Sequence, residues 1–387
     1  MLNGSLTRPV LLATSAFPPA RGGSSVLLYE LTRHFPAGSL VIVHQHFDPL
    51  PGMRRLPFQT KEVSLAGSSR WTDRLFRRAP WAALMLVRRA IYQMVKRYHV
   101  ERIYAHYPDA LFVVAAWQVA QKLSLPLTIY FDILWEESVT GFVQYLARRF
   151  EHAIVRYADR RFAITEFAVH YLTEKHGVPW ELIPHTIDTQ QIVNGLCDVP
   201  KRDRPIVHFA GSVYRVMNLD SLDRLVQSIS LCRSQPILDM CTRFRFGPTQ
   251  VPVQYRFLDR ESLIVAQRQA DILYLPQAFQ SPVPQMIRNN MPTKVMEYLV
   301  SGRPILVHSP ADSYLSWLAR KEGFAYVVDQ PSHHELATSI DRLLDDHDLQ
   351  RRLVQRAQEF ARSRASERWS AILQKALFET RSVKQHD

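Results

Sequence analysis

The chain has 387 residues, of which 47% are hydrophobic and 22% are charged. This length predicts two domains of nearly 200 residues each, and the composition excludes a chain too polar to fold. The sequence has neither a run of about 20 apolar residues nor a small-residue cleavage site after its first apolar run, so we expect a cytoplasmic protein. Its three cysteines lack CxxC or His-paired spacing, which predicts reduced thiols without a disulfide framework or zinc site.

The net charge of +12 is concentrated in one region. Between Arg54 and Arg102, twelve Lys or Arg residues stand against three acidic residues. Part of this region, Trp81 to Arg97, is expected to be a helix with cations along one stripe, and Trp71 and Phe76 precede it. The pattern indicates peripheral contact with an anionic membrane, although a core helix with one solvated edge fits it too. The region lacks a base-reading motif, so no nucleic-acid partner is expected.

The first half of the chain alternates strand and helix patterns. A buried strand over Pro9 to Ala16, the glycine pair Gly22 and Gly23, and a helix over Ser24 to His34 form the opening of a doubly wound domain, although a plain tight turn explains the glycines as well. Further strands are expected over 39–44, 102–105, 126–131 and 161–164, with helices over 110–122, 142–158 and 167–176.

Two polar residues follow strands of this half. His106 and Asp132 are expected at carboxyl ends of strands, where ligands collect in open α/β sheets. Asp132 is a candidate for orienting an acceptor hydroxyl, and the alternative is that it only caps the next helix.

The second half repeats the same opening. After the polar stretch 189–204, a strand over 205–210 leads into Gly211 and Ser212 and then into a helix over 219–232. This repetition predicts two similar sheets in place of one large sheet. Later elements are expected as strands over 244–246, 255–258, 272–275, 304–307 and 324–328, and as helices over 259–270, 314–322, 332–345, 349–363 and 369–380.

The stretch 270–308 is expected to hold a βαβ unit with a binding loop. Its loop, 277–291, leads to a short helix that begins near Pro292 and stops before Gly302. A helix N-terminus offers unpaired N–H groups and a partial positive charge, and Arg288 and Lys294 add full charges, so this segment predicts a diphosphate site. Glu297, one turn further on, is placed to accept hydrogen bonds from sugar hydroxyls.

The run Pro-Thr-Lys-Val-Met-Glu-Tyr-Leu over 292–299, followed by Ser-Gly-Arg-Pro-Ile-Leu over 301–306, resembles the donor-site helix of GT-B glycosyltransferases, in particular the retaining family 4. The second Glu of that family's E-x7-E motif falls on Glu297, and the first falls on Asn289. The chain is similar to a divergent branch with a Pro-Ser/Thr-Lys-x-x-Glu-Tyr motif. The resemblance implies an α/β fold of two Rossmann-like doubly wound domains facing a central cleft.

The resemblance also implies a domain plan. Residues 1–188 would form an acceptor-side domain, 189–204 a linker and 205–365 a nucleotide-sugar-binding domain, with 366–387 as a C-terminal helix that packs toward the first domain.

The family's chemistry gives the candidate residues their roles. A nucleoside diphosphate sugar would be the co-substrate, with no cofactor and no metal, and the acceptor would be a glycan or a lipid-linked glycan of surface polysaccharide or glycoconjugate synthesis. The catalytic candidates are Lys294, Arg215 and Asp132. The donor-binding candidates are Glu297, Arg288, Asn289, Thr293, Gly211, Ser212 and Leu258. The acceptor-side candidates are Gly22, Gly23 and His106.

The chain departs from the family pattern in several places. The Arg and Lys that usually follow the second glycine turn are replaced by Ser212 and Met217, and the usual His before Asp132 is Phe131. Arg215 lies between the first two positions and is expected to substitute for them. Two alternatives therefore stay open, a catalytically impaired partner or scaffold subunit and another nucleotide-sugar enzyme such as an epimerase.

Overall fold

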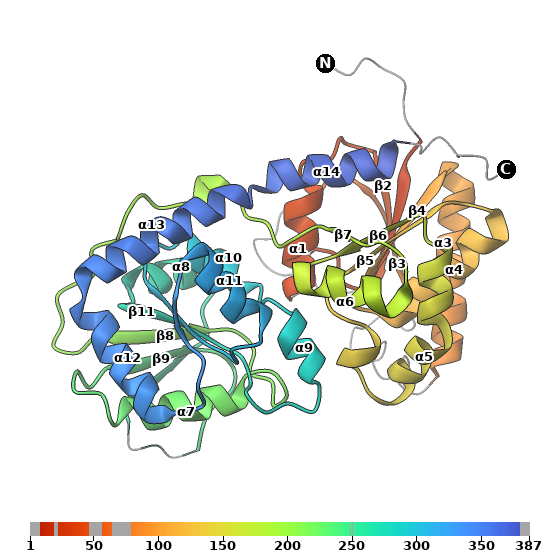
Figure 1. Ribbon diagram of the computed structural model, residues 1–387. Helices are drawn as coiled ribbons and strands as arrows, with labels where there is room; N and C mark the ends of the chain where they lie inside the picture. The colour runs from red at the N-terminus through yellow and green to blue at the C-terminus, as the bar shows by residue number, and fades with distance from the viewer. Residues whose placement is uncertain are drawn as a thin grey trace. The chain divides into compact units, whose positions relative to one another are not determined.

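The computed structural model describes residues 8–18, 22–45, 56–63, 79–247, 249 and 251–379. They form two compact units (Figure 1). The N-terminal unit contains the described residues up to Pro184 and those from Ser366 onward, and the C-terminal unit is His185–Ala365. The stretch 189–204 belongs to the C-terminal unit, where the Cys197 N–H donates to the Gly302 carbonyl at 2.9 Å.

The N-terminal unit is built on a seven-stranded parallel sheet with the order β3-β2-β1-β4-β5-β6-β7. Its strands are β1 (Val10–Thr14), β2 (Leu40–Gln45), β3 (Gln59–Val63), β4 (Arg102–Tyr107), β5 (Leu127–Phe131), β6 (Arg160–Ala163) and β7 (Glu181–Leu182). Successive residues of β1 join opposite layers, since Leu11 and Ala13 pack in one core cluster and Val10 and Leu12 in the other. Burial on both faces explains why these strands read as apolar runs.

Helices cover both faces of this sheet. One core cluster includes residues of α3 (Pro80–Tyr98), α4 (Ala110–Leu123), α5 (Gly141–Tyr157) and α6 (Glu166–His176). The other includes residues of α1 (Gly23–Thr32) and α14 (Ser366–Phe378). A short 3-10 helix, η1 (Glu136–Ser138), lies between β5 and α5. The C-terminal helix α14 packs on α1, and Ser366 Oγ lies 2.9 Å from His34 Nε2.

The C-terminal unit has a six-stranded parallel sheet with the order β10-β9-β8-β11-β12-β13. Its strands are β8 (Ile206–Ala210), β9 (Ile237–Cys241), β10 (Val253–Arg256), β11 (Ile272–Pro276), β12 (Ile305–His308) and β13 (Tyr326–Val328). Its helices are η2 (Thr189–Gln191), α7 (Leu219–Ile229), α8 (Arg260–Gln269), α9 (Pro284–Asn289), α10 (Lys294–Leu299), α11 (Tyr314–Glu322), α12 (His333–Asp345) and α13 (His347–Ser363). Two doubly wound parallel sheets confirm the predicted fold class.

The strand predicted over 244–246 is wrong. The strand is β9, and Phe244 and Phe246 lie after it with their rings 5.1 Å apart, edge to face. Asp239 in the middle of β9 interrupts the apolar run, which is why the pattern did not indicate a strand. The buried Asp239 carboxylate is tolerated because His208 and Arg256 bind it.

In the described part of the chain, no helix combines the length and the apolar character that crossing a bilayer requires.

Candidate functional site

Each sheet has one point where the chain order reverses. In the N-terminal unit this point lies between β1 and β4, and in the C-terminal unit it lies between β8 and β11. Loops that leave two neighbouring strands in opposite directions open a crevice at the carboxyl edge of such a sheet, and ligands bind there. The candidate residues fall into two groups, one at each of these points.

The first group joins β1, β4 and β5. Thr14 Oγ1 at the end of β1 lies 3.1 Å from His106 Nδ1 on β4, so this hydrogen bond crosses the reversal point. His106 Nε2 lies 3.5 Å from Asp132 Oδ2, just after β5. His106 is fully buried and Asp132 is 5% exposed. The structure therefore brings these two acceptor-side candidates together, with His106 behind Asp132.

The first turn of α1 completes this group. The Ser24 hydroxyl donates to Asp132 Oδ2, and α1 begins at Gly23 after Gly22, whose φ of 128° a side chain would strain. The N-cap of η1 is Trp135, so the cap alternative for Asp132 does not hold. Its other oxygen, Oδ1, is buried without a hydrogen-bond partner among the described residues. One carboxylate oxygen is thus held while the other still needs a donor such as a hydroxyl group.

A charged network that the sequence did not indicate follows Asp132 in the chain. Lys175 Nζ lies 3.1 Å from a carboxylate oxygen of Glu136, 2.6 Å from Glu137 and 2.8 Å from Glu151. Burial opposes the charge of Glu151, but hydrogen bonds from His176 and Lys175 outweigh it and hold the pKa of that carboxyl below its usual value. The network ties η1 to α5 and α6 and so fixes the segment that leaves β5.

The second group centres on Lys294 and Gly211. A Cβ added to Gly211 would lie 4.0 Å from Cγ of Lys294, so the lysine stem passes the glycine turn after β8. The Tyr298 hydroxyl accepts a hydrogen bond from the Ala210 N–H at 3.0 Å, which fixes α10 against the end of this strand. The φ of 148° at Gly211 favours glycine here. The fold thereby brings two of the predicted site residues close together.

Glu297 is paired with the same lysine. Lys294 Nζ lies 2.6 Å from Glu297 Oε2, and the two side chains are 28% and 22% exposed. Gln267 of α8, which the sequence did not indicate, donates from Nε2 to the same oxygen at 3.4 Å. The ammonium and the carboxylate are therefore both accessible, and they come from residues one helical turn apart in α10.

The loops that leave β8 and β11 are bound to each other. Asp220 Oδ2 accepts from the N–H groups of Phe279 and Gln280 at 2.9 and 3.2 Å. The Ser281 hydroxyl donates to the Val216 carbonyl at 2.7 Å. These hydrogen bonds join the two loops at the reversal point.

The helix-terminus part of the diphosphate prediction needs correction. The helix α10 has only six residues, Lys294–Leu299, and Pro292 precedes it. Part of the expected loop is a second short helix, α9, which begins at Pro284. Few aligned peptide dipoles contribute in so short a helix, so the cation available to an anion is Lys294 itself.

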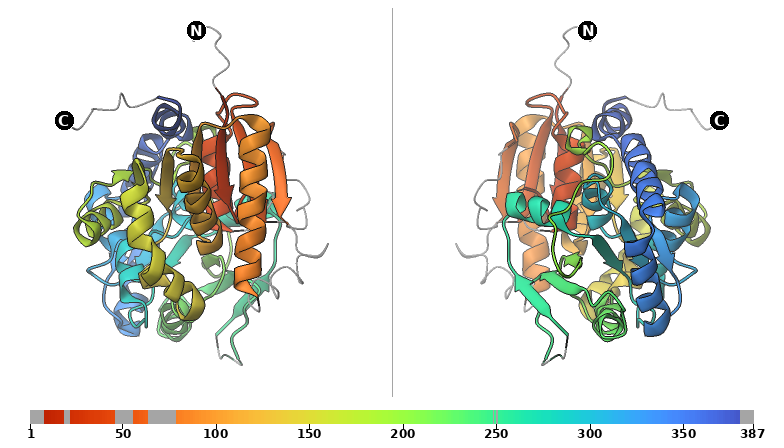
Figure 2. Two further views of the ribbon diagram at one scale, coloured as in Figure 1. Left: turned by 90° about the vertical axis from the view of Figure 1, so that its right-hand side faces the viewer. Right: turned by 90° about the vertical axis from the view of Figure 1, so that its left-hand side faces the viewer.

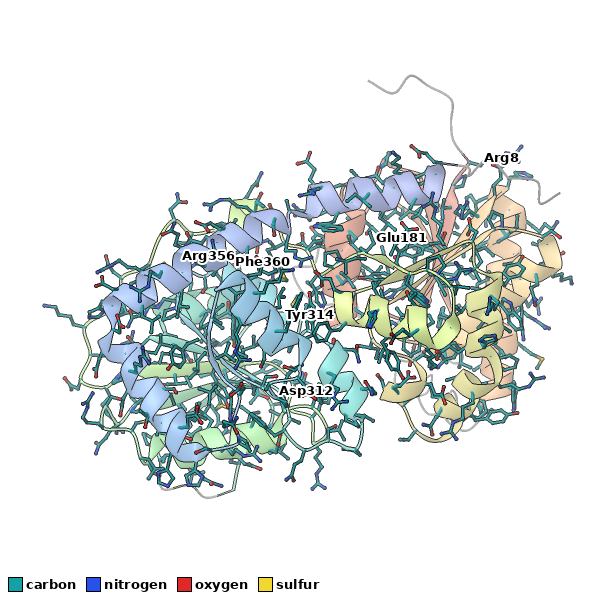
Figure 3. All side chains as sticks on the ribbon, in the orientation of Figure 1. Arg8, Glu181, Asp312, Tyr314, Arg356 and Phe360 are labelled. Atoms are coloured by element: carbon teal, nitrogen blue, oxygen red, sulfur yellow. The ribbon has the colours of Figure 1, made fainter. Side chains whose placement is uncertain are left out.

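Three other predicted site residues have surroundings of their own. Arg288 pairs with Asp312 at 2.6 Å, and both side chains are exposed; Figure 3 labels Asp312 in the C-terminal unit. Asn289 is 7% exposed, and its amide nitrogen donates back to the Gln285 carbonyl at 2.9 Å. Arg215 is exposed and forms no ion pair with a described residue.

Three further candidates are in place but make no side-chain contact that defines a role. Thr293 is the N-cap residue of α10, without a capping hydrogen bond from its side chain. Ser212 is exposed after Gly211, and Leu258 is half-buried between β10 and α8.

Residues 21–191 match the family model described as Glycosyltransferase Family 4. Sucrose-phosphate synthase from Thermosynechococcus elongatus is similar in structure, with a TM-score of 0.72 at 17% identity over 95% of this chain and 98% of that one. Anabaena HepE, solved in complex with UDP, gives a TM-score of 0.68 at 14% identity over 95% and 99%. The UDP-forming trehalose-phosphate synthase from Burkholderia vietnamiensis gives 0.62 at 12% identity over 95% and 99%. No curated protein matches the sequence.

The match over residues 21–191 places a family 4 glycosyltransferase domain in the first half of the chain, and the structural neighbours show the GT-B fold. The predicted family is thus confirmed, and so are its enzyme class and its fold.

This glycosyltransferase has one group of possible metal ligands among its described residues. His208, Asp239 and Cys241 hold ligand atoms within 4.8 Å of one another. Asp239 is already bound by His208 Nδ1 at 2.7 Å and by Arg256 Nε at 2.8 Å. Burial, with the nearby Asp239, raises the pKa of the Cys241 thiol to about 11. The Arg256 guanidinium already supplies a positive charge beside the Asp239 carboxylate. We therefore interpret this cluster as an ion pair within the sheet and not as a metal site.

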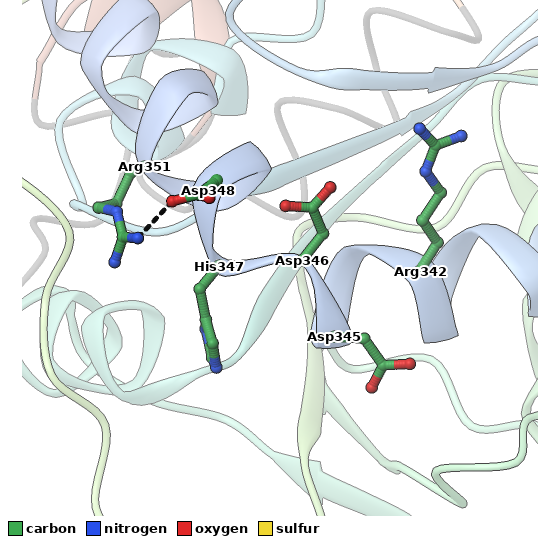
Figure 4. A pocket seen from close by; sticks show the side chains of 6 residues that line it. All are labelled: Arg342, Asp345, Asp346, His347, Asp348 and Arg351. Atoms are coloured by element: carbon green, nitrogen blue, oxygen red, sulfur yellow. Dashed lines mark hydrogen bonds and ion pairs between the residues drawn. The ribbon is translucent and has the colours of Figure 1, made fainter.

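An open hollow on the glycosyltransferase surface lies where α12 meets α13 (Figure 4). Its carboxylates have local partners. Asp346 caps α13 by accepting from the Leu349 N–H at 2.8 Å, Asp345 pairs with Arg233, and Asp348 pairs with Arg351. The residues that line the hollow include neither Lys294 nor Glu297.

Proposed function

We propose that this glycosyltransferase moves a sugar from a nucleoside diphosphate sugar to a hydroxyl group of a glycan or glycolipid, with retention of anomeric configuration and without a metal ion. The proposal extends to surface polysaccharide or glycoconjugate synthesis. The observation that carries it is the position of Lys294 against the Gly211 turn, beside Glu297, at the reversal point of the C-terminal sheet.

Lys294 is suited to the leaving group. Negative charge develops on the diphosphate as the bond to the sugar breaks, and a fixed ammonium stabilises that charge more in the transition state than in the ground state. The glycine turn lets phosphate oxygens approach the backbone, because no Cβ stands in the way. The ammonium would do the work that a divalent cation does in other transferases.

Glu297 is suited to the nucleoside side of the donor. A carboxylate accepts hydrogen bonds from two neighbouring sugar hydroxyls, and Gln267 steadies it. In the structure Glu297 neutralises Lys294. A bound diphosphate would pair with the Lys294 ammonium in its place, and Glu297 could then accept hydrogen bonds from the ribose. The UDP in the Anabaena HepE structure makes UDP the first nucleotide to test.

Asp132 is suited to the acceptor. Its Oδ2 is fixed by Ser24, and its Oδ1 lacks a partner among the described residues. Because Oδ1 is buried, the atoms that cover it would move aside for an acceptor hydroxyl, which would then supply that hydrogen bond and be oriented for attack. His106 acts through Asp132 as a positioning residue.

A thermal-shift panel of UDP, GDP and dTDP with their sugars tests the donor site. We expect one nucleotide family to stabilise the wild type, with Lys294→Ala and Glu297→Gln losing most of the shift. Lys321→Ala, an exposed lysine of the same unit, is the matched control and should keep it. Turnover that survives EDTA supports the metal-free step, and turnover abolished by EDTA overturns it.

A catalytically impaired partner subunit is the second candidate. The inward-turned Asn289 amide favours it, because this position holds the first Glu of the family motif and offers no carboxylate here. The absence of any nucleotide-induced shift in the wild type would establish this candidate over the transferase.

A further inference from the structure

Exposed apolar side chains gather at the start of two neighbouring helices of the N-terminal unit. Of the eleven large apolar side chains exposed among the described residues, five lie in the first two turns of α3 and α5. These are Trp81, Met85, Leu86, Val143 and Tyr145, at 49%, 58%, 39%, 37% and 53% exposure. Trp81 meets the Phe142 ring edge to face with centroids 5.5 Å apart, so the two sets form one surface. Exposed apolar side chains that cluster mark a contact site.

Arginines follow one turn later on both helices. Arg88 and Arg89 on α3 and Arg149 on α5 are exposed and form no ion pair with a described residue. Four residues separate Met85 from Arg89 and Tyr145 from Arg149, a rise of about 6 Å along each helix. We call these five apolar residues and three arginines the α3/α5 patch.

The two helices of the patch carry almost no opposing charge of their own, and Glu136 of the adjoining η1 is paired with Arg148 of α5 at 3.2 Å. No acidic residue occurs in α3. The acidic residue of α5, Glu151, is 2% exposed and bound by Lys175 and His176. The first turns of the two helices are thus apolar, and three arginines follow one turn later. This order complements a lipid surface, where the apolar turns would meet acyl chains and the arginines would meet phosphate groups.

The first turns of α3 and α5 lie at the carboxyl edge of the sheet. A helix that precedes a parallel strand runs from the carboxyl edge back to the amino edge, so α3 and α5 begin at the carboxyl edge, where His106 and Asp132 lie. The 19 residues of α3 span about 28 Å, whereas strands of four to six residues span about 13 to 20 Å. Figure 2 shows α3, in orange, along the face of this sheet.

We propose that the α3/α5 patch docks on bilayers that contain anionic phospholipids, with the apolar turns in the acyl boundary and the arginines among the phosphates. The predicted contact through α3 thereby gains a second helix, while Trp71 and Phe76 lie outside the described residues. Docking itself is independent of the donor chemistry. That the acceptor is carried by a lipid rests on the proposed function, because the patch and Asp132 share one edge of the sheet.

Vesicle flotation of the full chain, without donor or acceptor, tests the docking. We expect binding to phosphatidylcholine vesicles that contain phosphatidylglycerol and little binding to phosphatidylcholine alone. Arg88→Glu with Arg89→Glu should lower the partition coefficient at least about 30-fold, since each cation near an anionic surface contributes a factor of about five. Met85→Ser with Tyr145→Ser should also lower it, and an unchanged melting temperature shows that these exposed changes leave the fold intact.

Lys96→Glu with Arg97→Glu is the matched control. It makes the same charge change on the same helix about 12 Å further from the apolar turns, beyond the Debye length of about 8 Å at physiological salt, and should cost less than about fivefold. Equal losses for the two pairs would overturn the proposal, and so would a wild type that does not float. Sedimentation that shows a dimer dissolved by Met85→Ser with Tyr145→Ser would assign the patch to a second copy of the chain. Since flotation needs no nucleotide, its failure and a failure of the donor proposal are distinguishable.

Discussion

Lys294 Nζ lies 2.6 Å from Glu297 Oε2, while the stem of the same lysine passes the Gly211 turn. The donor proposal rests on this pair, because the diphosphate of a bound donor would bind Lys294 and its ribose would bind Glu297. Each partner is neutralised by the other until a ligand arrives.

Lys294→Met should weaken UDP binding about 10- to 100-fold, the equivalent of about 1.5 to 3 kcal/mol for a hydrogen bond to a charged group. Glu297→Gln should weaken it less, because the amide oxygen still accepts one hydroxyl. The double variant should lose less than the sum of the two, since each single change also leaves a charge unpaired. Isothermal titration calorimetry measures all four affinities, and strict additivity would show that the two residues do not share the ligand.

Asp132→Asn should lower turnover about 10- to 100-fold and leave UDP affinity unchanged, because the amide keeps the shape but loses the charge that orients the acceptor hydroxyl. Ser24→Ala should cost about 10-fold, because a hydrogen bond to a charged carboxylate contributes about 1.5 kcal/mol. Steady-state kinetics with varied acceptor measures kcat and KM separately. A change in UDP affinity with normal kcat would move Asp132 out of the acceptor site.

Local patterns predicted most of the fold. Strands such as β5 and β11 are buried on both faces and therefore read as apolar runs between turn residues. The edge strand β3 is polar, so its Gln-Thr-Lys-Glu-Val sequence gave no such signal. A buried Asp239 concealed β9, since its partners His208 and Arg256 come from other strands.

The candidate site was predictable only where its residues are close in sequence. Lys294 and Glu297 stand three apart on one helix, and a local motif indicates both. Gln267 and Ser24 act 30 and 108 residues away from their partners, so only the packed sheet shows them. Arg288 and Asn289 were near Lys294 in sequence, but α9 turns them to other partners.

Gly302→Ala should lower the free energy of unfolding by about 2 to 5 kcal/mol. Its φ is 74°, which costs an L-residue about 1 to 2 kcal/mol. The added Cβ would also lie 2.7 Å from Cys197 Sγ and 3.0 Å from the Gly195 carbonyl, and such overpacking costs about 1 to 3 kcal/mol. Gly195→Ala is the control, because its φ is 72° with no atom within 4 Å of the new Cβ. The free energies of unfolding of the two variants, measured by urea denaturation, should differ by the packing cost. Equal losses would mean that the 195–197 segment moves to make room for the new methyl group.

His308 should make the C-terminal unit less stable in acid. It is fully buried at the end of β12, with Nδ1 2.7 Å from the Tyr274 hydroxyl and Nε2 3.0 Å from the Gln330 carbonyl. Burial lowers its pKa from 6.5 to about 4. The unfolded chain therefore binds the proton first as the pH falls, and stability is lost between pH 6.5 and 4.

The size of this loss follows from the shift, which corresponds to about 3 kcal/mol at 1.36 kcal/mol per pKa unit. Above pH 6.5 both states are neutral at this residue and the contribution is constant. His308→Asn should remove this part of the acid sensitivity, whereas His170→Asn, on the surface of the other unit, should not. Hydrogen exchange in β11 and β12 peptides, corrected for intrinsic rates at each pH, measures the local stability. If wild type and His308→Asn lose protection equally between pH 6.5 and 4, another buried group controls the acid response of this sheet.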